Sequence, residues 1–122
     1  PGSLAHDHDL VQLAYQAVGR RYGAIVSIDG RGVVTQHLPA SGSEAAPLQA
    51  GAPVPLPQAY ELDDAPGFER FYLVTSDAPF PLESVVAAVR RRHTASAPAG
   101  GARLDLPNGM DQAAFLLRKD PR

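Results

Sequence analysis

The sequence contains no cysteine, so disulfide bonds and thiolate metal sites are excluded. It also has no apolar run approaching the roughly 20 residues that a membrane-spanning helix needs. An excess of basic residues is absent as well, because 11 Lys and Arg stand against 13 Asp and Glu, a formal net charge of −2. Domains that bind nucleic acid usually carry a strong basic excess, so we expect no nucleic-acid partner.

The 122 residues are enough for one domain but not for two. Folding a chain of this size hides roughly two-thirds of the surface of the unfolded chain, so a core can form without cross-links. Pro1, Gly2 and Ser3 are typical of the remnant of a purification tag, and we leave them out of the fold argument. The prediction is a single globular domain over residues 4–122.

Strand-like alternation of apolar and polar residues dominates the first third of the chain. Residues 11–15, 22–28 and 33–38 each alternate in this way. Asp29-Gly30 separates the second of these segments from the third, and this dipeptide is a strong signal for a hairpin turn. We therefore expect three consecutive strands that form an antiparallel meander.

The middle of the chain alternates between loop and strand signals. Residues 40–52 are rich in Ser, Gly and Ala and predict a surface loop. The alternate prolines of residues 54–57 suit an edge strand or a polyproline segment, and residues 63–67 have the chemistry of a turn. Residues 68–76 are apolar on both faces, which predicts a central strand. The last alternating segment, residues 113–117, predicts the final strand.

Helical periodicity occurs once, where Leu82, Val85, Val86 and Val89 fall on a single apolar stripe. Pro81 suits the first turn of a helix, and basic residues follow at its end, so we predict an amphipathic helix over 81–93. Together these elements predict a mostly β (α+β) fold. We expect an antiparallel sandwich or curved sheet of about six or seven strands, with the helix against one face or edge.

No arrangement of residues predicts a catalytic centre, a cofactor or a metal site. A Gly-x-Ser-x-Gly nucleophile motif is missing, and the glycines at 30, 32, 100 and 101 lack the spacing of a phosphate-binding loop. Alternate histidines in His6-Asp7-His8-Asp9 could share a metal ion, but two ligands are too few. Turn chemistry explains the acidic run before Pro66-Gly67 without any bound ion.

The residues we consider as interaction sites are few. An exposed edge strand offers unpaired backbone groups to a partner chain, and we look for one at residues 54–57. The arginines at the end of the predicted helix could meet an acidic partner. The full set of candidates is Val54, Leu56, Asp63, Asp64, Glu69, Arg90, Arg91 and Arg92.

Three stretches of the chain carry a family resemblance: residues 21–39 around the Asp29-Gly30 hairpin, residues 60–80 around Pro66-Gly67-Phe68-Glu69, and the tail 110–119. Together they resemble the C-terminal domain of ActD-like proteins from myxobacteria and related soil bacteria. More distantly, they are similar to a widespread domain of unknown function that is appended to bacterial lipoproteins, kinases and caspase-like proteins. The resemblance covers nearly the whole domain and offers no catalytic residues.

What the resemblance implies is a cellular setting. ActD-like proteins look like anti-sigma-type regulators, in which a short cytoplasmic region and one membrane-spanning helix precede this domain outside the membrane. The chain would then be a periplasmic domain of a single-pass inner-membrane protein, with a cytoplasmic location as the alternative.

We therefore expect a non-enzymatic sensor or protein-interaction domain of an envelope-associated regulatory protein, whose partner is a protein or peptide. The alternatives are a small-molecule or ion-binding module that uses Asp63, Asp64 and Glu69, and a hydrolase with an unrecognised site. An exposed edge or apolar patch would favour the first. A pocket of convergent polar side chains would favour the second, and a histidine of perturbed pKa beside a nucleophile would favour the third.

Overall fold

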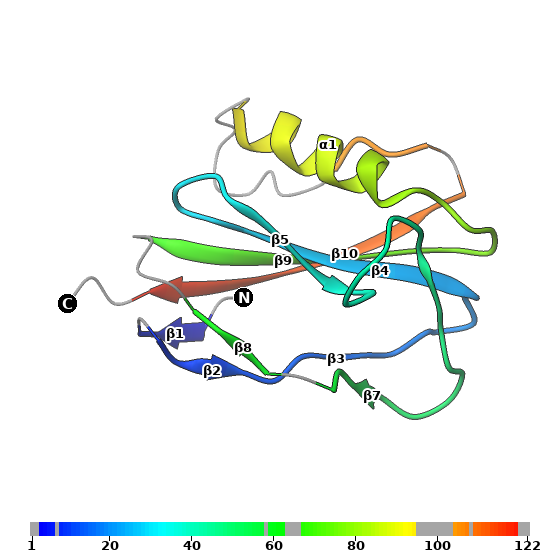
Figure 1. The fold of residues 1–122 in the computed structure, drawn as a ribbon, viewed down its shortest axis with the longest axis horizontal. Coiled ribbons are helices and arrows are strands. Elements are labelled where there is room, and N and C mark those ends of the chain that lie inside the picture. Colours follow the sequence, from blue (N-terminus) through cyan, green and yellow to red (C-terminus); the bar gives the residue numbers. More distant parts are fainter. Residues whose placement is uncertain are drawn as a thin grey trace.

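A computed structural model describes residues 3–6, 8–57, 59–62, 67–94, 104–107 and 109–119. Figure 1 shows one helix above a sheet, with further short strands below the sheet. In chain order the elements are β1 (Ser3–Ala5), β2 (Leu10–Val11), β3 (Ala14–Tyr15), β4 (Tyr22–Asp29), β5 (Val34–Leu38), β6 (Ala46–Pro47), β7 (Val54–Pro55), β8 (Tyr60–Glu61), β9 (Phe68–Ser76), α1 (Leu82–Thr94) and β10 (Asp111–Lys119).

A six-stranded sheet forms the middle layer, in the order β1-β10-β9-β4-β5, and β6 pairs with the start of β4. Its strand pairs are antiparallel, except that β1 runs parallel to β10. Because β9 lies between β4 and β10, the prediction of a central strand over residues 68–76 is confirmed. The position of β9 also explains why both of its faces are apolar.

Helix α1 covers one face of this sheet (Figure 1). Its apolar stripe buries Val85 and Val89 completely against a cluster that includes Val26 of β4 and Val74 of β9. Burying one such valine contributes about 1.5–3 kcal/mol to folding, so this contact fixes the helix on the sheet. The helix predicted over 81–93 is confirmed as Leu82–Thr94.

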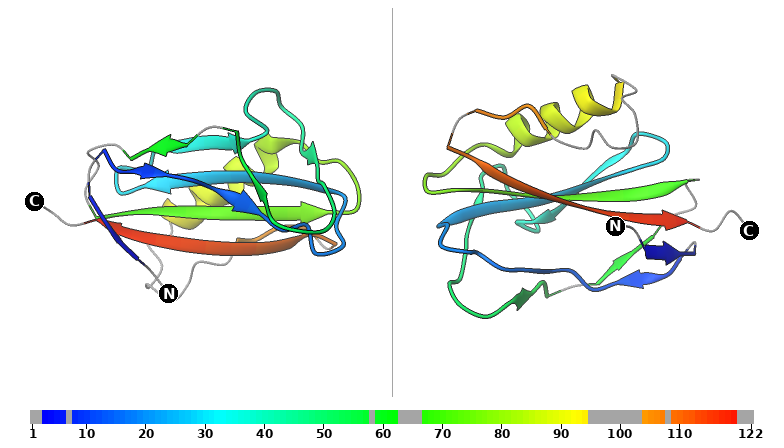
Figure 2. Two further views of the ribbon diagram at one scale, coloured as in Figure 1. Left: turned by 90° about the horizontal axis from the view of Figure 1, so that it is seen from below. Right: turned by 180° about the vertical axis from the view of Figure 1, so that it is seen from behind.

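The opposite face is covered by extended chain rather than by a helix. Side chains alternate along a strand, so Ile25, Phe71 and Leu73 point away from α1. Below them two short antiparallel pairs, β2 with β8 and β3 with β7, cross the sheet. Tyr15 and Leu62 are buried between these pairs and the sheet. Helix, sheet and extended chain therefore make three layers, as Figure 2 shows from two further sides.

The predicted three-strand meander is half right. Segments 22–28 and 33–38 do form a hairpin, as β4 and β5, but residues 11–15 are not its neighbours in the sheet. They form β2 and β3, which lie in the lower layer and pair with β8 and β7. Alternation predicts that a segment is extended, but it does not select the strand's partner. Here β9 takes the place beside β4.

The predicted hairpin turn at Asp29-Gly30 is confirmed: the β4–β5 turn runs from Asp29 to Val33, with a positive φ of 86° at Gly32. One local detail differs from expectation. Inside the predicted loop 40–52, β6 pairs with the start of β4 at Tyr22 and Gly23.

The predicted fold class is confirmed: the chain is mostly β, built from antiparallel strands with α1 on one face. In the part of the chain that the structure describes, no helix has the length and apolar character needed to cross a membrane.

Candidate functional site

The outer edge of β10 is only partly paired. On its inner side β10 pairs with β9 from Asp111 to Arg118, whereas on its outer side β1 pairs only with residues 117–119. Within the described residues, no strand pairs with the outer side of residues 111–116. Seen from below in Figure 2, β10 runs along one border of the sheet and β1 crosses only its C-terminal end. We call residues 111–116 the open edge.

An apolar groove lies beneath the open edge. Its walls are Ala113 and Phe115 of β10 on one side and residues 11–14 of the lower layer on the other, and its floor is Phe71 and Leu73 of β9. The cavity has a volume of about 290 Å³. We call it the β10 groove. Ala113 and Phe115 point into it because they are register partners of Leu73 and Phe71, and such partners share a face of the sheet.

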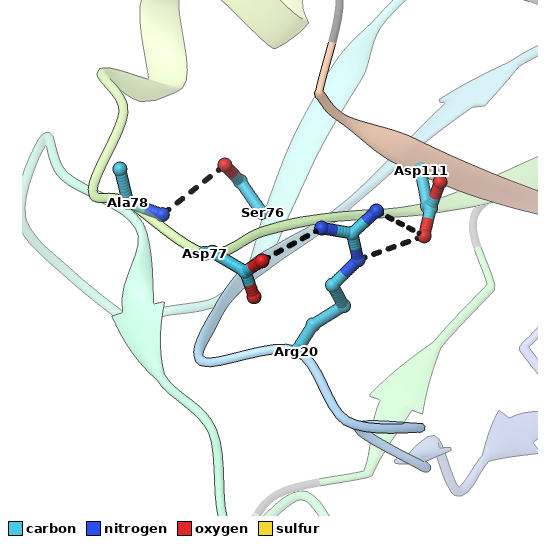
Figure 3. A network of polar contacts seen from close by, with 5 residues as sticks. All are labelled: Arg20, Ser76, Asp77, Ala78 and Asp111. Carbon is cyan, nitrogen blue, oxygen red and sulfur yellow. Dashed lines mark hydrogen bonds and ion pairs between the residues drawn. The ribbon is translucent and has the colours of Figure 1, made fainter.

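A second cavity of about 230 Å³ continues the groove toward the start of β10, since both cavities are lined by Leu73 and Ala113. Its end is charged. Figure 3 shows Arg20 between two carboxylates: its Nη1 donates to Asp77 Oδ2 at 3.1 Å, and its Nε donates to Asp111 Oδ2 at 2.8 Å. The hydrogen bond with Asp111 is the main cause that raises the pKa of Arg20.

Exposed apolar side chains gather beside these cavities. Phe115 is 45 % exposed, and Val18, which lines the second cavity, is 83 % exposed. Val18 also has a φ of 50°, a left-handed conformation that costs a β-branched residue about 1–2 kcal/mol. Leu10, also exposed, precedes Val11 of the groove wall. An exposed valine with strained backbone therefore lies beside the apolar groove.

A polar pair of one buried and one half-buried side chain lies elsewhere on the same face of the sheet. Ser27 Oγ of β4 and His37 Nε2 of β5 share a hydrogen bond of 2.7 Å. The His37 ring packs edge-on against Tyr60, with centroids 4.5 Å apart, and lies 5.5 Å from the ring of Phe71. Burial among these rings lowers the pKa of His37 to about 4, so the imidazole is neutral at pH 7.

A hydroxyl beside a neutral imidazole is the arrangement that activates a serine nucleophile. Ser27, however, is 0 % exposed, so in this structure no substrate can reach its oxygen. A cavity of about 160 Å³ does border His37 and Tyr60 from the β5 side. The hydrogen bond satisfies the buried Ser27 hydroxyl and holds β5 on β4, which accounts for the pair without catalysis.

Two buried carboxylates complete this face. Asp29 and Glu69 are register partners at the ends of β4 and β9, and both are almost fully buried. Asp29 Oδ1 accepts hydrogen bonds from the backbone N–H groups of Arg31 and Val33, at 2.8 and 3.0 Å. Glu69 Oε2 accepts from the Tyr60 hydroxyl at 3.4 Å.

The interaction residues predicted from sequence do not converge on one place. Val54 is half-buried in β7, where it pairs with Tyr15, and Leu56 is buried, with its N–H bonded to Leu13. One side of residues 54–57 is therefore occupied by residues 13–15. Leu56 and Glu69 are buried, so they are not placed to contact a partner in this structure. Asp63 and Asp64 lie outside the described residues.

The basic residues at the end of α1 belong to the layer on the other side of the sheet from the β10 groove. Arg90 and Arg91 are exposed, whereas Arg92 is half-buried. Near the N-terminus, His8 Nδ1 pairs with Glu61 Oε2 at 2.8 Å on the surface. Within the described residues, no three His, Asp or Glu side chains gather as ligands for a metal ion.

Sequence reasoning missed the open edge and the Ser27–His37 pair. The residues of the last strand were predicted, but its pairing depends on contacts with β9 and β1, which are distant in the sequence, and a three-residue strand such as β1 leaves little periodic signal. Ser27 and His37 are ten residues apart on two strands, so only the register of the hairpin brings them together. An apolar residue directly before a turn glycine, Val18 before Gly19, was a usable signal for a contact loop.

Comparison of this chain with protein-family models, with curated proteins and with solved structures gives no significant match. The resemblance to ActD-like proteins therefore stays a prediction.

Proposed function

We propose that this domain is a non-enzymatic protein-interaction module that binds an extended segment of another protein along the open edge of β10. The observation that carries the proposal is the combination of an outer edge at residues 111–116, with which no strand pairs in the described part of the chain, and an apolar groove directly beneath it.

A strand added at a sheet edge gains affinity from main-chain hydrogen bonds and specificity from pockets for alternate side chains. Both components are present at β10. Along residues 111–116, the backbone groups that do not pair with β9 face outward without a strand partner in the described part of the chain, and the groove beside Ala113 and Phe115 can take apolar side chains. An edge of this kind otherwise promotes aggregation, so natural proteins rarely leave one open without a use.

The exposed apolar residues support the same surface. Phe115 points to the groove side of the open edge, and Val18 lies at the second cavity. Aromatic and aliphatic anchors at the centre of an interface carry most of its binding energy once water is excluded. These two side chains are thus our proposed anchors.

We also propose the setting that the family resemblance implies, an envelope-associated, anti-sigma-like regulatory protein with this domain in the periplasm. The support is the likeness of residues 21–39, 60–80 and 110–119 to ActD-like proteins. An apolar span of roughly 20 residues upstream of Leu4 in the natural protein would agree with a membrane anchor. An enzyme domain in that place would contradict this setting.

The interaction is tested by NMR titration of the ¹⁵N-labelled domain with the capped peptide acetyl-Thr-Val-Thr-Val-Thr-Thr-amide. We expect chemical-shift changes concentrated in the amides of residues 111–116. A peptide with proline in place of both valines should give much smaller changes, because proline cannot donate a main-chain hydrogen bond.

Two matched variants of the domain sharpen this test. Phe115→Ser removes the anchor at the groove, and Val33→Ser removes an exposed apolar side chain from the β4–β5 hairpin, away from the groove. We expect only Phe115→Ser to weaken the peptide-induced shifts. Shifts centred on α1 or on His37, or no shifts at all, would overturn the proposal.

A further inference from the structure

We propose that the segment bound at the open edge carries a lysine or arginine where it passes Asp111, and apolar residues at its two other positions that face the β10 groove. This inference rests on the proposed function and adds the chemistry of the partner.

The charge at the start of β10 is the first support. One guanidinium, that of Arg20, serves two carboxylates: Nη1 pairs with Asp77 Oδ2 at 3.1 Å, and Nη2 pairs with Asp111 Oδ2 at 2.7 Å. The three side chains together carry a net charge of −1. Arg20 is 25 % exposed, whereas Asp77 and Asp111 are 65 % and 64 % exposed, so the carboxylates are what a partner meets (Figure 3).

Asp111 also has bonding capacity to spare. All of its contacts with Arg20 use Oδ2, and the structure gives Oδ1 no hydrogen bond within the described residues. A carboxylate can accept at both oxygens, so an incoming ammonium or guanidinium can bind Oδ1 without displacing Arg20.

Strand geometry then assigns the positions on the bound segment. Residues directly opposite each other on neighbouring strands share a face, so the partners of Asp111, Ala113 and Phe115 point to the groove side. Antiparallel pairing is slightly more stable per residue than parallel pairing. A six-residue antiparallel segment would therefore place its second and fourth residues over the apolar groove and its sixth beside Asp111.

The groove favours apolar side chains at the two inner positions. Leu13, Phe71 and Leu73 line it, and Ala113 has a short side chain that leaves space above Leu73. Charged side chains line only the second of these two cavities, where Arg20 and Asp111 form part of the wall. The apolar groove and the acidic end of the second cavity therefore follow one another along the open edge.

A second copy of this chain fits the edge less well. Antiparallel self-pairing within residues 111–116, centred on Ala113, would set Phe115 opposite Asp111. Residues 111–116 contain no Lys or Arg that could meet the exposed carboxylate. A different partner chain with a basic residue can pair with the exposed Asp111 carboxylate, whereas residues 111–116 of a second copy cannot.

The test compares two capped peptides, acetyl-Thr-Val-Thr-Val-Thr-Lys-amide and acetyl-Thr-Val-Thr-Val-Thr-Glu-amide, by the same NMR titration. Exposed ion pairs contribute about 0.2–1 kcal/mol, so we expect the lysine peptide to bind roughly fivefold more tightly at low salt. The preference should shrink as ionic strength rises. In Asp111→Asn and in Asp77→Asn it should fall, more strongly in the former.

The outcomes separate the two proposals. Equal binding of both peptides to the unchanged domain overturns the basic position and leaves the proposed function standing. A preference for the lysine peptide that persists in both Asn variants also overturns the basic position, because the preference then arises from other residues. Failure of both peptides, while the domain is folded, overturns the proposed function and this inference together. A domain that is a stable dimer through β10 in light scattering also overturns the inference.

Discussion

Phe71 and Phe115 are register partners on β9 and β10, yet Phe71 is 4 % exposed and Phe115 is 45 % exposed. The two rings point to the same face of the sheet. Leu62 and the lower layer cover Phe71, whereas Phe115 lies beyond that cover, at the wall of the β10 groove. Phe71 is therefore expected to contribute to the stability of the domain, and Phe115 to its proposed binding activity.

Truncation of these two rings should have opposite consequences. Phe71→Ala removes a buried ring, so we expect the free energy of unfolding to fall by about 3–5 kcal/mol in urea denaturation. Phe115→Ser should lower it by less than about 1 kcal/mol, while it weakens binding of the test peptide. Comparable losses of stability in both variants would mean that Phe115 belongs to the core.

Relieving the left-handed conformation of Val18 should stabilise the domain. With φ of 50°, Val18→Asn is expected to raise the free energy of unfolding by about 1 kcal/mol, because asparagine tolerates this region better. The same variant should bind the test peptide less well. Val33→Asn is the control, since Val33 is exposed without a positive φ and should gain nothing. A loss of stability in Val18→Asn would contradict the expectation.

His37 should make stability depend on pH. Its pKa in the folded protein is about 4, below the ordinary value of 6.5, so the unfolded chain takes up the proton first as the pH falls. The stabilisation is therefore complete above about pH 6.5 and is lost progressively between pH 6.5 and 4. Because the ring is partly exposed, the loss will be smaller than the full pKa difference implies.

The measurement is chemical denaturation of the natural domain and of His37→Gln from pH 7 to pH 4. The variant lacks the titrating ring but keeps Asp29 and Glu69, so subtracting the two curves isolates His37. A difference between the curves that does not change with pH would refute the assignment.

The Asp29 carboxylate should stabilise the β4–β5 turn. It accepts two backbone N–H groups, and Asp29→Ala would leave these donors without their acceptor at a cost of about 1–3 kcal/mol. Asp29→Asn keeps an acceptor oxygen, so its loss should be clearly smaller. Thermal unfolding of both variants checks the order, and equal losses would show that the charge, not the acceptor, matters.

Local pattern was enough for the helix and for the long strands, but not for short strands such as β1 and β6. The stripe through Leu82 and Val89 predicted α1, and the apolar residues on both faces of 68–76 predicted a central strand. These signals depend on residues within one or two turns or pleats of each other, and such neighbours are adjacent in sequence. The fold class followed from the order of these elements.

Tertiary structure decided everything that depends on which segments meet. It placed residues 11–15 in the layer beneath the sheet, brought Ser27 to His37, and paired β1 with residues 117–119 of β10. Strand pairing and burial are long-range choices, made by the total apolar area and the hydrogen bonds of competing arrangements. No window of the sequence contains that competition, so the candidate site emerged only from the folded chain.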